Sequence, residues 1–148
     1  MIENLDKIEQ YIDNTIGTAI RSYNPMIKSD IFGPIYGHWE SEAGSKLFLA
    51  SQGSILHGSF TREGGRPRRL LGTIDNHQPI KDKGLALSFS VYWPSNNDPE
   101  YRSVTSYTGQ FHPTENKITT IFLLANETIP SKDYASVFVG NDVFTRIK

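Results

Sequence analysis

The apolar residues of this chain follow two different periods. From residue 2 to residue 20 they recur at steps of three and four, which places them on one face of a helix. These positions are Ile2, Leu5, Ile8, Tyr11, Ile12, Ile16, Ala19 and Ile20. The pattern predicts an amphipathic N-terminal α-helix within residues 1–24, because Asn24-Pro25 is a typical helix stop. Residues 25–36 contain several chain breakers and are interpreted as a linker.

From Gly37 onward, apolar and polar residues alternate in short runs between turn-rich clusters. Alternation with a period of two is typical of strands with one buried face. The expected strands are residues 38–41, 46–51, 55–61, 69–75, 85–93, 103–111 and 117–125, and two closing runs at 135–140 and 142–148. Short links between about eight strands favour an all-β domain, an eight-stranded antiparallel up-and-down β-barrel over residues 37–148. Such a barrel has room inside for side chains or for one small ligand.

Asp142 lies between Gly140-Asn141 and the strand-like run Val-Phe-Thr-Arg. Gly-Asn predicts a turn, and Asp commonly hydrogen-bonds its own backbone in turns. The alternative is that the carboxylate of Asp142 points into the barrel and binds a ligand. The stretch taken alone favours the turn.

The composition of the chain excludes some classes of site and disfavours some classes of partner. The net charge is −1 and there is no cysteine, so disulfides and thiolate metal sites are excluded. The four histidines are scattered, and we expect no metal and no cofactor. Arg62, Arg66, Arg68 and Arg69 form a basic loop without interleaved aromatics, so we expect neither nucleic acid nor membrane as a partner. The N-terminal residues do not resemble a signal peptide, which favours a cytoplasmic protein, with a secreted mature form as the alternative.

Five motifs in the order of the chain resemble the avidin and streptavidin family, and the resemblance extends over residues 37–148, about three quarters of the sequence. They are "GHWESEAGS", "ILHGSF", "LALSFSVYW", "SVTSYTGQF" and "VGNDVFTRIK". The resemblance implies a barrel that binds biotin at one open end without chemistry, so no catalytic residue is expected. It also implies a homo-oligomer, either a dimer or a tetramer.

The resemblance carries ligand-binding roles to individual positions. Ser45 falls where a hydroxyl donates to the ureido oxygen of biotin, and Asp142 falls where a carboxylate accepts from a ureido nitrogen. Tyr134 falls where a side chain reaches the pocket of the neighbouring subunit. The full set of expected ligand-binding residues is Ser41, Ala43, Ser45, Phe60, Arg62, Trp93, Ser103, Thr105, Tyr107, Phe122, Leu124 and Asp142.

Three positions depart from the family pattern. Ser41 replaces an asparagine and Phe60 replaces a tyrosine, which removes a hydroxyl donor. Arg62 stands near a serine that would accept from the second ureido nitrogen, and arginine cannot accept a hydrogen bond. At roughly 1–3 kcal/mol for each lost contact, we expect weakened affinity for biotin or a biotin-like ring compound.

Two alternatives to a binding protein remain open. A helix-lidded barrel could act as an isomerase or cyclase by holding a hydrophobic substrate in a reactive shape, with Arg62 and Asp142 in charge-stabilising and acid–base roles. Alternatively, the pocket is vestigial and the N-terminal helix mediates assembly. Trp39 and Arg146 resemble a barrel-closing pair, and we predict a structural cation–π contact between them.

Overall fold

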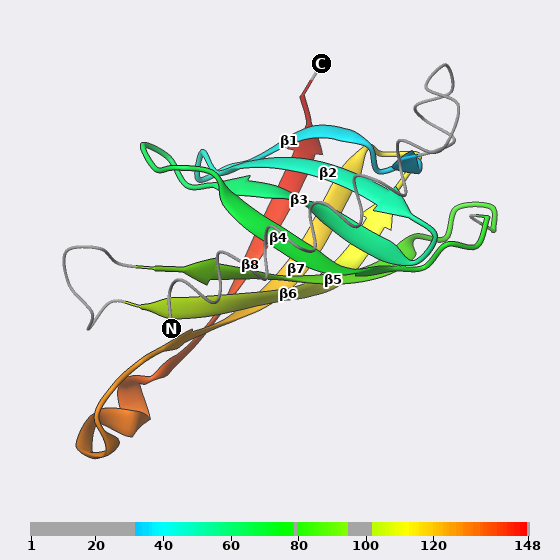
Figure 1. Ribbon diagram of the computed structural model, residues 1–148. Coiled ribbons are helices and arrows are strands. Elements are labelled where there is room, and N and C mark those ends of the chain that lie inside the picture. Colours follow the sequence, from blue (N-terminus) through cyan, green and yellow to red (C-terminus); the bar gives the residue numbers. More distant parts are fainter. Residues whose placement is uncertain (1–31, 79, 95–101, 148) are drawn as a thin grey trace.

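The structure, a computed structural model, describes residues 32–78, 80–94 and 102–147. Within these residues, eight antiparallel strands pair in chain order and close into a barrel (Figure 1). The strands are β1 (Gly37–Ser41), β2 (Lys46–Gln52), β3 (Ile55–Thr61), β4 (Arg68–Ile74), β5 (Leu85–Trp93), β6 (Ser103–His112), β7 (Lys117–Asn126) and β8 (Val137–Arg146). The predicted fold class is confirmed. The predicted N-terminal helix and the first part of the linker lie outside the described residues.

The closing run of the chain differs from its prediction. Instead of a turn at Gly140-Asn141, β8 is continuous and pairs with β7 through Phe122↔Gly140, Ile121↔Asn141 and Thr120↔Asp142. The turn prediction is therefore wrong, because backbone hydrogen bonds to a neighbouring strand outweigh the local turn preference of Gly-Asn. β8 also pairs with β1, which closes the barrel and leaves no free sheet edge.

The core follows directly from the alternation of the strands. β5 shows it most clearly: five alternate residues, from Leu85 to Trp93, are buried, and the residues between them are exposed or half-buried. Inward-facing residues of all eight strands form one hydrophobic cluster. Near one end, the Trp39 and Phe111 rings meet edge to face at 5.6 Å and fill the interior together with Ile118 and Phe144.

Residues 32–36, the described end of the predicted linker, pack against the barrel. Ile35 is fully buried, and its carbonyl accepts a hydrogen bond of 3.0 Å from the indole N–H of Trp39. The hydroxyl of Ser51 donates to the carbonyl of Phe32 at 3.2 Å. This segment therefore contributes to the closed end of the barrel.

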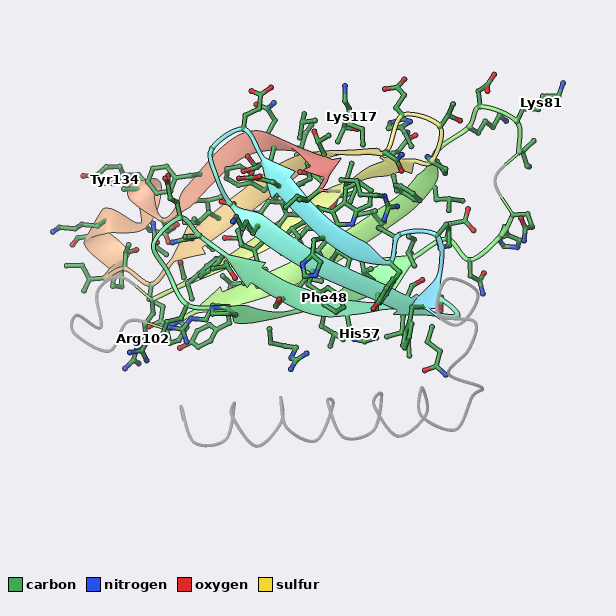
Figure 2. All side chains as sticks on the ribbon, turned by 90° about the horizontal axis from the view of Figure 1, so that it is seen from above. Phe48, His57, Lys81, Arg102, Lys117 and Tyr134 are labelled. Carbon is green, nitrogen blue, oxygen red and sulfur yellow. The ribbon has the colours of Figure 1, made fainter. Side chains whose placement is uncertain are left out.

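The two ends of the barrel differ in their connections. Figure 2 shows Lys81, in the β4–β5 connection, at one end, and Arg102 and Tyr134 at the other. Tyr134 belongs to a short 3-10 helix, η2 (Pro130–Ala135), which joins β7 to β8 and projects beyond the strands (Figure 1). The candidate site lies at this second end.

Candidate ligand-binding pocket

An open pocket of about 600 Å³ lies at the barrel end where β3 and β7 finish and β6 and β8 begin. Its volume is within the range of small-molecule sites. The residues that line it are Ala43, Ser45, Phe60, Arg62, Glu63, Thr105, Tyr107, Phe122, Leu124, Gly140, Asn141 and Asp142. They come from four strands, β3, β6, β7 and β8, and from the β1–β2 and β3–β4 connections, so the closed barrel is what brings them together.

The apolar part of the pocket is aromatic. Phe60 and Tyr107 are almost fully buried, with ring centroids 5.4 Å apart, and Phe122 lies 5.4 Å from Tyr107. Phe89 stacks beneath Tyr107 at 4.8 Å, so the Tyr107 ring is held on both sides. Offset and edge-on aromatic contacts of this kind are favourable and fix ring positions. The pocket therefore offers a preformed flat surface to a ring-shaped ligand.

Gly140 makes the position of Phe122 possible. A Cβ atom at residue 140 would lie 2.4 Å from the ring of Phe122, so this ring occupies the space that any other side chain would need. Gly140 is thus required for close approach of an aromatic wall to β8, and not for a turn.

Trp93 lies beside the pocket and is covered by Arg62. The guanidinium carbon of Arg62 is 3.8 Å from the centre of the Trp93 ring, which is a cation–π contact. The indole N–H of Trp93 donates to the hydroxyl of Thr105 at 2.9 Å, a bond between two buried side chains. The indole is therefore fixed by Thr105 and shielded by Arg62, and does not line the open space.

The β1–β2 turn supplies part of the polar rim, next to β8. The hydroxyl oxygen of Ser41 accepts from the backbone N–H of Ser45 at 3.1 Å, and the N–H of Gly44 donates to the Ser41 carbonyl at 3.0 Å. Gly44 has φ +87°, a left-handed conformation that favours glycine. The turn presents Ala43 and Ser45 to the pocket, while Ser41 is buried behind them.

Asp142 lies on β8 with its side chain in the pocket. Its backbone carbonyl accepts a 2.9 Å hydrogen bond from the hydroxyl of Thr120, which fixes the strand at this residue. Partial burial raises the pKa of the Asp142 carboxyl, because the charged form loses solvation. The carboxylate is therefore oriented by a strand and poorly solvated, which favours an N–H donor from a ligand.

The charges of Asp142 and Arg62 both act on Tyr107. Its pKa is raised well above the usual value, first by burial and then by the negative charge of Asp142, while the positive charge of Arg62 opposes the shift. Burial lowers the pKa of Arg62, and the charge of Tyr107 acts in the opposite direction. Arg62 and Asp142 thus both act on Tyr107 and, among the described residues, form no ion pair with each other.

The structure brings nine of the twelve predicted ligand residues to the pocket lining. The other three, Ser41, Trp93 and Ser103, are buried beside it. Sequence reasoning missed Glu63, Gly140 and Asn141. Glu63 and Asn141 are sequence neighbours of the predicted residues Arg62 and Asp142, and this proximity could have identified them. The role of Gly140 could not be found in this way, because it depends on Phe122 on the neighbouring strand.

No group of three or more potential metal ligands is found among the described residues. The same part of the chain contains no helix long and apolar enough to span a membrane. What the lining can do chemically is to stack a ring on aromatic side chains, accept hydrogen bonds at Asp142, and donate them from Arg62 and Ser45.

The comparison with known proteins agrees with this architecture. The family model described as "Avidin family" matches residues 31–147. The match spans the whole barrel, from the segment before β1 to the end of β8. The chain therefore belongs to the avidin family.

Proposed function

We propose that this protein binds a small ring compound, biotin or a biotin-like molecule, in the pocket at the open end of the barrel and does so without catalysis. The observation that carries the proposal is the position of Asp142, an oriented and partly desolvated carboxylate beside an aromatic floor. Membership of the avidin family supports the same function.

The binding mode follows from the groups that the pocket offers. A ureido ring stacks against Tyr107 and Phe122, which are held by their aromatic neighbours. The hydroxyl of Ser45 donates to the ureido oxygen, and the carboxylate of Asp142 accepts from one ureido N–H. Charge-assisted hydrogen bonds of the second kind are the stronger of the two.

We also propose that the affinity for biotin is weakened. Phe60 carries no hydroxyl to donate to the ureido oxygen. Arg62 lines the pocket with a group that cannot accept from the second ureido N–H. Two lost contacts at roughly 1–3 kcal/mol each reduce affinity by about two to four orders of magnitude.

Calorimetric titration with biotin tests this function. We expect the wild-type protein to bind, and Asp142→Ala to lose at least about 10-fold in affinity because a charge-assisted hydrogen bond disappears. Asp82→Asn is the matched control, since Asp82 is exposed and does not line this pocket.

The control variant is expected to bind as the wild type does. Absence of heat with biotin up to millimolar concentration, or equal affinity in the wild type and in Asp142→Ala, would reject biotin as the ligand of this pocket. A thermal unfolding curve of each variant shows that it is folded.

The cyclase or isomerase alternative has weaker support. It requires a substrate enclosed away from water, whereas the described pocket is open to solvent. The lid that it requires, the predicted N-terminal helix, lies outside the described residues. Non-catalytic binding remains the function that we propose.

A further inference from the structure

Arg62 is a solvent-exposed cation that lines the pocket and has no anionic partner among the described residues. Its guanidinium lies over the Trp93 ring at 3.8 Å and lines the open space. Within the described residues, its side chain makes no hydrogen bond and no ion pair. A guanidinium carries five N–H donors in a planar fork, so the pocket holds unused donors at this point.

Arg146, an arginine with a structural role in the same barrel, provides a comparison for Arg62. Its guanidinium also covers an indole, that of Trp39, at 4.3 Å. It donates to the carbonyls of Tyr36 and Pro34 at 2.6 Å and 2.8 Å, and to Asn116 Oδ1 at 3.0 Å. Arg146 is therefore satisfied by the protein, whereas Arg62 has only the cation–π contact.

Neither of the two carboxylates near Arg62, those of Asp142 and Glu63, acts as its anionic partner. Asp142 lines the same pocket but, within the described residues, forms no ion pair with Arg62. Glu63 follows Arg62 in the chain, and its carboxylate lies against the β1–β2 turn, 3.2 Å from the place where a Cβ of Gly44 would be. The positive charge of Arg62 is thus left for a ligand.

The pocket consequently has two poles. Asp142 accepts hydrogen bonds on one side, Arg62 donates them on the other, and both charges act on Tyr107. A ureido ring has an N–H group on each side. One N–H can donate to Asp142, but the other would face the N–H donors of Arg62, and two donors cannot form a hydrogen bond. A ring whose second side carries a carboxylate suits both poles, because arginine pairs with carboxylates through two parallel N–H···O bonds.

We propose that Arg62 determines ligand specificity and that the pocket takes a small planar ring with a ureido-type edge and an adjacent carboxylate. The inference rests on the proposed function, since it uses the same pocket and the same role of Asp142. It adds that the preferred ligand carries an anionic group on the ring itself.

Uracil and orotate test this inference. Both rings have a ureido edge, and orotate differs from uracil by one ring carboxylate. We expect calorimetry to show orotate binding the wild-type protein at least about 10-fold more tightly than uracil. Arg62→Met, which keeps an unbranched side chain over Trp93 but removes the charge, is expected to abolish this preference.

Arg66→Met is the matched control. Arg66 is exposed on the same β3–β4 connection and does not line the pocket, so its loss changes the net charge equally. The orotate preference is expected to survive in this variant. Circular dichroism and thermal unfolding of both variants confirm the fold before titration.

Equal binding of orotate and uracil by the wild type would overturn the inference, as would a preference that persists in Arg62→Met. A loss of preference in both arginine variants would also overturn it, since net charge alone would then explain the effect. Biotin binding that depends on Asp142 would still support the proposed function in each of these cases. If the wild type binds none of the three rings, both proposals fail.

Discussion

Asp142 combines two requirements that oppose each other. Its carboxylate is placed to receive an N–H donor, but its partial burial disfavours the charged form and raises its pKa above the ordinary value of 3.8. Without a ligand, this charge therefore lowers the free energy of unfolding at neutral pH. Sites that bind polar ligands commonly carry such a cost to stability.

This cost leads to a prediction about pH. Because the pKa of Asp142 is higher in the folded state, the protonated carboxyl contributes stability that is present below pH 3.8 and is lost as pH rises through the folded-state pKa. We expect Asp142→Asn to raise the free energy of unfolding at pH 7 by less than about 1 kcal/mol, because solvent screens a half-buried charge.

Urea unfolding curves of the wild type and Asp142→Asn, measured at several pH values, check this. The difference between the two proteins is expected to shrink towards zero as pH falls below 3.8. A variant that is less stable at pH 7, or a difference that grows in acid, would contradict the argument. The exposed residue Asp82 again supplies the control, as Asp82→Asn.

At the scale of elements, the β1–β8 pair closes the barrel, and Arg146 reinforces it. The register pairs Trp39 with Arg146, and the guanidinium lies over the indole as predicted from the sequence. The same guanidinium ties the carbonyls of Pro34 and Tyr36 to the last strand. One side chain therefore joins the last strand to residues 34–39, more than 100 positions earlier in the sequence.

Loss of this residue is expected to destabilise the fold. Arg146→Met removes three hydrogen bonds and leaves two carbonyls without this donor, so we expect the free energy of unfolding to fall by about 2–4 kcal/mol. Chemical denaturation measures the change. Thr145→Ala, an exposed neighbour on β8, is expected to stay within about 0.5 kcal/mol of wild type, and a similarly small effect in Arg146→Met would refute the closing role.

At the scale of the whole molecule, β7 and β8 carry apolar residues on the outer face of the barrel. Ile121, Leu123, Val137 and Val139 are exposed, and Leu123 pairs directly with Val139 across the two strands. Exposed apolar surface that continues over neighbouring strands is typical of protein–protein interfaces. We propose that a second copy of this chain covers it, in line with the homo-oligomer expected from the family resemblance.

This proposal predicts that one charged residue introduced on this surface disrupts the oligomer. Val139 is 71% exposed, so Val139→Glu is expected to change the stability of the isolated barrel by less than about 0.5 kcal/mol but to break an interface built on it. Light scattering after size-exclusion chromatography measures the mass. Ala86→Glu, exposed on β5 away from this surface, is the control.

We expect the wild type and Ala86→Glu to be oligomers and Val139→Glu to be a monomer. A monomeric wild type would refute the proposed homo-oligomer, and an oligomer that survives Val139→Glu would place its interface elsewhere. Tyr134, 88% exposed on η2, is free of the barrel in the described structure, and its predicted contact with a neighbouring subunit stays a prediction.

The amino-acid sequence by itself determined the strands and the order in which they pair. Alternation of apolar and polar residues is a local property, and short connections leave an antiparallel meander as the simplest arrangement. The resemblance to the family also predicted that Ser45, Tyr107 and Asp142 share one site, and all three line the pocket. At Gly140-Asn141, however, the sequence predicted a turn, and this prediction was wrong.

Only the tertiary structure decided how the pocket is built. Gly140 accommodates the Phe122 ring across a strand pair, and Arg62 covers Trp93 instead of pairing with Asp142. Neither fact has a local signature, because each depends on residues from different strands that meet only once the barrel has closed. Most strands follow from neighbours in the chain, whereas the continuity of β8 and the chemistry of the pocket depend on neighbours in space.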